Sequence, residues 1–280
     1  MSLFVNNNGE LINTDGYAIA AGNRGHLYGD GLFESIKVIN GQPINLEQHL
    51  NRLFEGMAVL KMIKPQNYSV TFFDREIHAL LTKNEISEGA RIRLSIDRAK
   101  GGTYLPSDNN VEYLIEVHPT DQNEFRLNEK GLCVDLYNEM KKSVNLLSNY
   151  KTKNCLVYIM ARLRAQELGK DDLLILNEKH GIIEATSSNL FMVSNGVLYT
   201  PGLDSGCLGG TMRMQIINLA IRERIKVYEC NISPQHLLSA DDVFLTNAIQ
   251  GILWVQAFRT KTYGNTIAQE MVNILNQEWK

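Results

Sequence analysis

The chain has 280 residues, of which 44% are hydrophobic and 21% charged, and its formal net charge is −3. Its charges form no basic block, and no apolar run approaches the roughly eighteen residues of a membrane-spanning helix, which argues against nucleic-acid and membrane partners. We therefore expect a globular, cytoplasmic protein, with two domains rather than one, that acts on small metabolites.

The first 119 residues are predicted to form a smaller α+β domain. Asn40-Gly41 is typical of a type I′ turn and should join the two strands of a hairpin. Asn45 is then expected to cap a helix, because apolar residues follow it at helical spacing. The glycine-rich segment 98–106 is long enough to be a binding loop or a dimer-contact loop. The other elements predicted here are a helix over 70–83 and strands over 90–96 and 111–117.

A polar segment, 120–130, has little periodicity and is the predicted linker to a larger, β-rich domain over 131–280. A helix over 154–168 is expected to bury one apolar stripe, formed by Leu156, Ile159, Met160, Leu163 and Ala165. The remaining elements predicted in this domain are a strand over 132–136, hairpins between 173 and 199, a helix from 210 to about 222, strands over 226–230, 243–246 and 252–258, a short helix over 234–238, and a final helix.

The four cysteines are far apart in the sequence and include no CxxC pair. This spacing is typical of reduced thiols inside a protein, and it argues against both a zinc site and a disulfide framework. No metal site is therefore predicted.

Lys151 precedes the helix over 154–168 and is the candidate attachment point for an aldehyde cofactor. An aldehyde is held by a primary amine, and a lysine amine reacts only when part of it is unprotonated, which burial or a neighbouring cation favours. Lys153 could be that cation, although the spacing alone does not show whether the two ammonium groups face each other. Two solvent-exposed lysines at the start of a helix are the alternative interpretation.

Two further segments carry groups that a phosphorylated pyridine aldehyde needs. Glu184 begins a loop of small polar residues, where a carboxylate could keep a pyridine nitrogen protonated, although a polar hairpin tip is equally compatible with this composition. The glycine-rich turn 201–213 leads into a helix, whose N-terminal amides can bind phosphate or simply start the helix. Arg52, on a separate helix, would add charge-assisted donors. These groups together suggest pyridoxal phosphate.

In the order and spacing of its motifs, the chain resembles the class IV aminotransferases. These are the fold-type IV pyridoxal-phosphate enzymes, which include branched-chain and D-amino-acid aminotransferases and 4-amino-4-deoxychorismate lyase. The resemblance covers nearly the whole chain and implies a two-domain α+β fold, with the cofactor in the interdomain cleft, and a homodimer. The motifs that carry it are residues 23–34, His49-x-x-Arg52-Leu53, Lys151-x-x-Asn154, residues 184–191, Tyr199-Thr200-Pro201, Gly210-x-x-Arg213 and Thr246-Asn247-Ala248.

The resemblance also implies roles for particular residues. Lys151 would hold the cofactor as a Schiff base and move the substrate proton, and Glu184 would contact the pyridine nitrogen. The other cofactor-binding residues would be Arg52, Ser188, Asn189, Thr211, Met212 and Asn247. The substrate carboxylate would lie near Phe33, Arg93 and Ala248, with Arg91 and Arg98 as less favoured alternatives to Arg93. Because Arg91 and Arg93 share one face of a strand, the pattern alone does not choose between them.

Two reactions are compatible with this resemblance. We favour amino transfer between an amino acid, with branched-chain ones among the candidates, and a 2-oxo acid. The alternative is a 4-amino-4-deoxychorismate lyase, which releases pyruvate and p-aminobenzoate. Asn154 stands three residues after Lys151, as in the lyases and the D-amino-acid enzymes, and residues 199–204 and 210–213 are lyase-like. Arg93-Leu94-Ser95 lacks the Arg-x-His carboxylate trap of the D-amino-acid enzymes.

Overall fold

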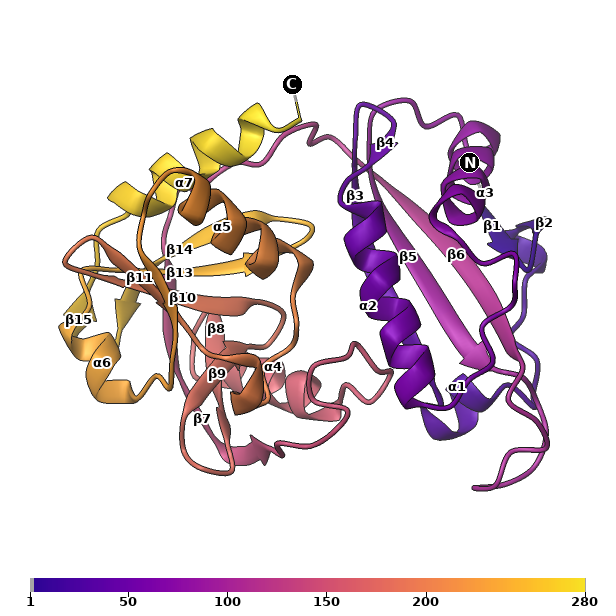
Figure 1. Ribbon diagram of the computed structural model, residues 1–280, viewed down its shortest axis with the longest axis horizontal. Coiled ribbons are helices and arrows are strands. Elements are labelled where there is room, and N and C mark those ends of the chain that lie inside the picture. The colour runs from indigo at the N-terminus through magenta and orange to yellow at the C-terminus, as the bar shows by residue number, and fades with distance from the viewer. Residues whose placement is uncertain (1–2, 280) are drawn as a thin grey trace. The chain divides into compact units, whose positions relative to one another are not determined.

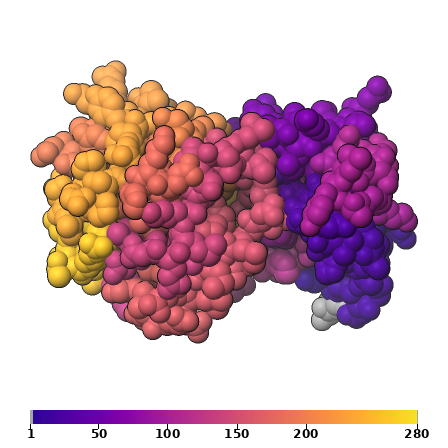
Figure 2. Space-filling view, turned by 90° about the horizontal axis from the view of Figure 1, so that it is seen from below, coloured from indigo at the N-terminus to yellow at the C-terminus, as the bar shows by residue number. Residues whose placement is uncertain are grey.

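The computed structural model describes residues 3–279 and divides the chain into two compact units. The first unit contains the residues up to Glu124 together with Tyr150–Asn154, and the second contains Phe125–Asn149 and the residues from Cys155 onward. In the ribbon and space-filling views the first unit is mainly indigo to purple and the second mainly salmon to yellow (Figure 1, Figure 2). The first division falls inside the polar segment 120–130, and Lys151 lies in the short stretch that returns to the first unit.

An antiparallel six-stranded sheet is the centre of the first unit. Its strands, in the order β2-β1-β6-β5-β3-β4, are β2 (Glu10–Asn13), β1 (Phe4–Asn7), β6 (Val111–Thr120), β5 (Gly89–Arg98), β3 (Gly31–Ile39) and β4 (Gln42–Pro43). The predicted turn between β3 and β4 is confirmed, because Asn40 and Gly41 both have positive φ, 50° and 73°, as a type I′ turn requires.

Two helices, α2 (Leu46–Val59) and α3 (Val70–Lys83), cover one face of this sheet (Figure 1). Their buried residues, such as Leu50 and Ile77, form one core with Ile92 and Leu94 of β5. Since side chains alternate along a strand, Arg93 and its odd-numbered neighbours lie on the face opposite the helices. A short helix, α1 (Arg24–Tyr28), follows the 3-10 turn Thr14–Gly16.

Asn45 stands where the cap of α2 was expected, but its side chain does not cap the helix. It has a φ of 54°, and its side chain makes no capping hydrogen bond. A cap normally has an extended backbone, which lets the side-chain oxygen reach the amides of the first turn. The left-handed conformation of Asn45 instead joins the β3–β4 hairpin to the helix.

The second unit contains a closed ring of six strands. The ring runs β10-β13-β14-β7-β8-β9 and closes where Asn189 of β10 pairs with Glu184 of β9. A closed sheet has no unpaired edge, so residues at the closure are held on both sides. The ring strands are β7 (Leu132–Lys142), β8 (Asp172–Asn177), β9 (Ile182–Ala185), β10 (Asn189–Ser194), β13 (Asp242–Asn247) and β14 (Gly251–Phe258). Added to them are β11 (Val197–Thr200), β12 (Val227–Glu229) and β15 (Lys261–Thr262).

Of the helices described in the second unit, three pack against strands of the ring, and the fourth adds Leu237 to the core that the ring strands form. They are α4 (Leu156–Glu167), α5 (Thr211–Arg222), α6 (Pro234–Ser239) and α7 (Thr266–Gln277), with a 3-10 turn at Leu203–Ser205. Both units therefore mix helices with sheet, and the predicted α+β class is confirmed. Within residues 3–279, no helix is long and apolar enough to cross a membrane.

The orientation predicted for the helix after Lys151 is confirmed at Ala165 and wrong at the four larger residues. The small residues Ala161 and Ala165 are buried against the strands, whereas the large apolar side chains of Leu156, Ile159, Met160 and Leu163 are 71%, 50%, 43% and 50% exposed. Small residues allow the helix to lie close to the sheet, so the larger side chains form an apolar stripe on its outer surface. We call these four residues the α4 stripe.

Candidate active site

Lys151 lies in an extended segment on the edge of β3. The amide of Phe33 donates to the carbonyl of Lys151 over 2.9 Å, and the amide of Lys153 donates to the carbonyl of Gly31 over 3.0 Å, on either side of a bridge between Leu32 and Thr152. This edge is open because β4 pairs with β3 only at Val38 and Ile39. The helix predicted over 154–168 begins at Leu156, five residues after Lys151, so the lysine itself lies in the strand-like segment before it.

The amine of Lys151 and the guanidinium of Arg93 contact the same aromatic ring. Nζ of Lys151 lies 4.3 Å from the centroid of the Phe33 ring, and Cζ of Arg93 lies 4.0 Å from it, which are cation–π distances. Arg93 is also 3.7 Å from Glu116, and its side chain is 31% exposed. The sheet thus fixes an amine and a carboxylate-binding group on the same face.

Lys153 lies on this face too, but its charge is compensated. Its ammonium is 2.5 Å from the carboxylate of Asp97, a residue that pairs with Gly31 across β3 and β5. An ion pair of this kind weakens the field that Lys153 exerts on the amine of Lys151. The sequence did not reveal Asp97 because it comes from a different strand.

The other two candidate arginines of β5 differ from Arg93. Arg91 is exposed, and Arg98 is buried, with its donors directed to Asp30, Asn109 and the carbonyl of Leu60. Burial alone would raise the pKa of Asp30, but hydrogen bonds and charges from Arg98 and Arg24 lower it overall. Arg98 therefore has a structural role, because its side chain links Asp30, Asn109 and the backbone at Leu60. Of the three arginines, Arg93 is the one that contacts the same ring as Lys151.

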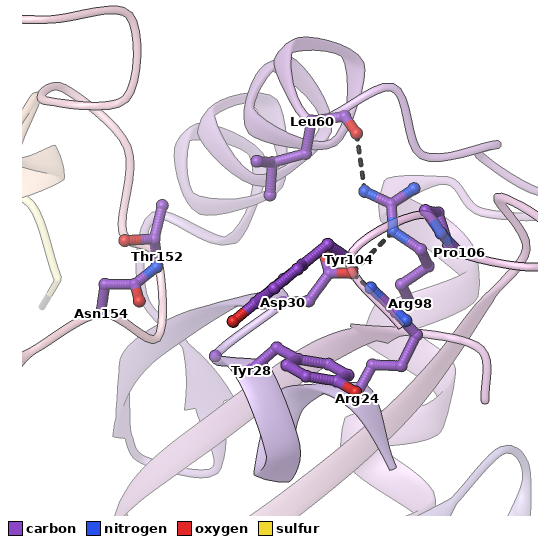
Figure 3. Close-up of a pocket in the computed structure, with 11 residues that line it drawn as sticks. Arg24, Tyr28, Asp30, Leu60, Arg98, Tyr104, Pro106, Thr152 and Asn154 are labelled. Atoms are coloured by element: carbon purple, nitrogen blue, oxygen red, sulfur yellow. Dashed lines mark hydrogen bonds and ion pairs between the residues drawn. The ribbon is translucent and has the colours of Figure 1, made fainter. Parts of the chain in front are cut away.

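A pocket of about 300 Å³ lies beside the Lys151 segment in the first unit. Figure 3 shows Asp30 between Arg24 and Arg98, with the rings of Tyr28 and Tyr104 on one side. The two ring centroids are 5.9 Å apart. Arg24 also donates to the carbonyls of the loop that carries Tyr104, at Gly101 and Thr103, over 2.9 and 2.6 Å. The glycine-rich loop is thus tied to the wall of the pocket by the Arg24 side chain. The lining is completed by Gly29, Gly31, Leu60, Pro106, Thr152 and Asn154.

Arg52 forms an ion pair with Glu34, a residue that the sequence pattern did not single out. Nε of Arg52 donates to Oε1 of Glu34 over 2.8 Å, a second guanidinium nitrogen contacts Oε2, and Nδ1 of His49 lies 2.6 Å from Oε2. Burial would raise the pKa of Glu34, but the charge of Arg52 and the hydrogen bond from His49 outweigh it and lower the pKa to about 2. A glutamate in the mainly apolar strand β3 was the available signal.

Glu184 is buried at the closure of the ring in the second unit. Its Oε1 accepts from Nζ of Lys142 over 2.7 Å and from the hydroxyl of Tyr158 over 2.9 Å. Its Oε2 accepts from the amide of Leu208 over 2.8 Å. Burial and the neighbouring carboxylate both raise the pKa of Tyr158, so the phenol remains a donor. Sequence reasoning named Glu184 and missed Lys142 and Tyr158, which come from β7 and α4.

The loop after Glu184 meets the N-terminus of α5. The amide nitrogen Nδ2 of Asn189 donates to the carbonyl of Leu208 over 2.8 Å. Gly210, the N-cap of α5, offers no capping side chain, and a Cβ at this position would lie 1.9 Å from Oδ1 of Asn189. Glycine is therefore required for this approach of the backbone, which brings Oδ1 of Asn189 to the start of α5, where the amides of Thr211 and Met212 lie.

Polar groups from β13 gather near the same loop. Nδ2 of Asn247 donates to Oγ of Ser188 over 3.0 Å. Thr246 pairs with Asn189 across β10 and β13, and its hydroxyl is buried with no hydrogen-bond partner within the described part of the chain. Ala248, half-buried, lies in the turn that follows Asn247. A cluster of amides and hydroxyls of this kind can bind a phosphate group.

Known proteins are similar to this chain over most of its length. The family model "Amino-transferase class IV" matches residues 31–258. A putative branched-chain-amino-acid aminotransferase of Methanocaldococcus jannaschii is 27% identical over 98% of this chain and 94% of its own length. An aminodeoxychorismate lyase of Vibrio harveyi is 27% identical over 84% of this chain and 85% of its own. In structure, the chain is similar to a branched-chain aminotransferase of Thermoproteus uzoniensis solved with norvaline, with a TM-score of 0.89, 22% identity, and coverage of 98% of this chain and 93% of that one.

Proposed function

Because the chain belongs to the class IV aminotransferase family, we propose that it is a pyridoxal-phosphate-dependent aminotransferase. It would move an amino group between an amino acid, with branched-chain substrates as the first candidates, and a 2-oxo acid. The observation that carries this proposal is the placement of an amine and a guanidinium, Lys151 and Arg93, around the ring of Phe33. An α-amino acid presents a carboxylate one bond away from the carbon that carries its amino group, so these two groups suit the two ends of one small substrate.

The donor chemistry of the chain fits the cofactor. A phosphate group needs several hydrogen-bond donors, and the second unit offers the amides at the start of α5, the orphaned hydroxyl of Thr246 and the side chains of Ser188 and Asn247. A pyridinium nitrogen needs an acidic partner, for which Glu184 is suited. We propose that Asn189, Thr211 and Met212 belong to the same phosphate site, and that Arg52 adds its charge to it. Arg52 is itself paired with Glu34.

In the proposed reaction, pyridoxal phosphate supplies an electron sink when it is bound. Nζ of Lys151 holds the cofactor between turnovers and takes the proton from Cα of the substrate. Phe33 would fix the direction of the Lys151 side chain, and Arg93 would orient the substrate through its carboxylate. We propose Ala248 as a further residue near that carboxylate. These groups would act by positioning the substrate and the lysine, because Nζ of Lys151 must come within hydrogen-bond distance of the proton that it removes.

The role proposed for Arg93 gives a kinetic prediction. Arg93→Met is expected to raise KM for the amino acid by about 10- to 100-fold with a smaller change in kcat, because a charge-assisted hydrogen bond contributes about 1.5–3 kcal/mol. Steady-state kinetics with varied amino acid would measure this. Arg91→Met is the matched control, since Arg91 is exposed on the same strand. An equal rise of KM in both variants would contradict the assignment.

The alternative function is a 4-amino-4-deoxychorismate lyase. It is supported by the similarity to the Vibrio harveyi lyase over most of both chains and by the lyase-like residues 199–204. One experiment separates the two functions: the protein loaded with pyridoxal phosphate is incubated with aminodeoxychorismate and, separately, with a panel of amino acids plus 2-oxoglutarate. We expect glutamate and a new 2-oxo acid in the second arm. Release of p-aminobenzoate without amino transfer would establish the lyase instead.

We also propose that the protein is a homodimer and that the α4 stripe lies in its interface. Contiguous exposed apolar surface marks protein–protein contacts. The tip of the glycine-rich loop, Tyr104 and Leu105, is 92% and 82% exposed and is a second candidate contact. Leu163→Glu is expected to weaken the dimer at least about tenfold, because it places a charge in an apolar interface. Light scattering after gel filtration would show the change in mass. Ile221→Glu, a change of an exposed residue of α5, should leave the dimer unchanged.

A further inference from the structure

Lys142 has no role in the function proposed above, yet its ammonium is closely bound. Nζ of Lys142 donates to Oε1 of Glu184 over 2.7 Å and to the carbonyl of Ser148 over 2.9 Å. It also lies 5.6 Å from the ring centroid of Tyr158. The side chain is only 13% exposed, at the end of β7, where the pairing of β7 with β8 is irregular. A lysine this far inside a protein loses much of its hydration, so it requires a compensating partner.

Among the hydrogen-bond partners of Glu184 within the described residues, Lys142 is the one that carries a positive charge. The other two, the hydroxyl of Tyr158 and the amide of Leu208, are neutral donors. Neutral donors orient a carboxylate, but a cation at 2.7 Å also stabilises its negative charge by Coulomb attraction, which is strong where water is excluded. The thiol of Cys207 is near enough to interact electrostatically with Glu184, Lys142 and Arg213. Arg213, however, is already paired with Glu229.

This charge matters for a carboxylate that shares a proton with a pyridine nitrogen. The proton can reside on the nitrogen, which leaves a carboxylate, or on the oxygen, which leaves a neutral pyridine. A buried carboxylate without a cation favours the second arrangement, because burial penalises the charged form. An ammonium beside the carboxylate favours the first. Only the protonated ring is a strong electron sink.

We propose that Lys142 is a positioning residue that keeps Glu184 ionised, so that the proton shared with the cofactor stays on the ring nitrogen. The inference rests on the proposed function, because it requires that Glu184 faces the cofactor. Lys142 acts through Glu184 and does not touch the substrate. Its second bond, to Ser148, fixes the backbone three residues before Lys151, so one ammonium supports both the loop that leads to the lysine and the carboxylate.

The test compares charge with hydrogen bonding at position 142. Lys142→Gln keeps a donor without the charge, Lys142→Arg keeps the charge, and Lys141→Met is the control. Lys141 is exposed on the same strand, with its Nζ 3.0 Å from His180. Each protein is loaded with pyridoxal phosphate labelled with ¹⁵N in the ring, and the resonance of that nitrogen is recorded. We expect Lys142→Gln to move the resonance toward the unprotonated position and to lower kcat about 10- to 100-fold with little change in KM.

Lys142→Arg is expected to retain the protonated resonance, and Lys141→Met should match the parent protein. A protonated nitrogen in Lys142→Gln, at any level of activity, would overturn the role of Lys142 while leaving the proposed function intact. If the parent protein binds the cofactor at no lysine, as shown by the absence of a borohydride-reduced adduct, the proposed function fails and this inference fails with it. Should Lys142→Gln fold poorly, the comparison of Lys142→Arg with the parent decides: loss of the protonated resonance there contradicts a role of charge, and retention supports it.

Discussion

Lys151→Ala is expected to lower kcat for amino transfer by about a thousandfold or more and to abolish covalent attachment of pyridoxal phosphate. The alanine removes both the amine that would hold the aldehyde and the base that would take the substrate proton, and a positioned base alone contributes about 10²–10⁴-fold. The measurement is steady-state turnover with an amino acid and 2-oxoglutarate, together with mass mapping of the adduct after borohydride reduction.

Lys153→Ala is the matched control for this prediction. Lys153 is two residues away in the same extended segment, on the same face of the sheet, and its ammonium is engaged by Asp97. We expect this variant to keep the adduct at Lys151 and to lose less than about tenfold in kcat. An adduct that maps to Lys153, or full turnover by Lys151→Ala, would remove Lys151 from the mechanism.

The candidate lysine could be named from the sequence, but its local structure could not. The apolar spacing after Lys151 correctly predicts a helix, which begins at Leu156, close to the expected residue 154. In the structure the lysine segment pairs with β3, about 120 residues earlier in the chain. Local periodicity does not report such a contact, because pairing between distant segments depends on which sheet edge is left open.

The α4 stripe shows a second limit of sequence reasoning. Leu156, Ile159, Met160 and Leu163 recur at helical spacing, and this recurrence correctly predicts that they share one face. It does not say whether that face meets the protein's own core or another surface. In this helix Ala165, which the pattern included, and Ala161, which it did not, contact the sheet.

The sequence also could not show which charged residues pair with the candidate site residues. Glu184 and Arg52 were both named as candidates, but their partners Lys142 and Glu34 lie 42 and 18 residues away in the chain. In both cases a buried carboxylate is held by a cation and by neutral or weakly basic donors, Tyr158 in one unit and His49 in the other. Each unit therefore fixes the orientation of a charged group by pairing it, since an unpaired buried charge would be costly.

Glu34→Gln is expected to lower the free energy of unfolding by about 3 kcal/mol at pH 7. The side chain of Glu34 is 1% exposed, and its pKa is lowered from 4.5 to about 2, a difference that corresponds to about 3 kcal/mol of favourable interaction of the ionised form. The glutamine keeps the shape but leaves Arg52 without its carboxylate. Urea unfolding would measure the loss, with Glu55→Gln, an exposed change on the helix that carries Arg52, as a control within about 0.5 kcal/mol.

The pH dependence of this difference separates charge from packing. Because the pKa of Glu34 is lower in the folded protein than in the unfolded chain, its contribution is complete above about pH 4.5 and is lost as the pH falls toward 2. Burial lowers the pKa of His49 below 6.5 although Glu34 opposes this shift, so both proteins should begin to lose stability at a higher pH, and Glu34→Gln should lose more of it than the parent. As Glu34 is protonated, the gap between the parent and Glu34→Gln should narrow below about pH 4.5. A gap that stays constant down to pH 3 would mean that glutamine disturbs packing, and that the ionised pair with Arg52 contributes little.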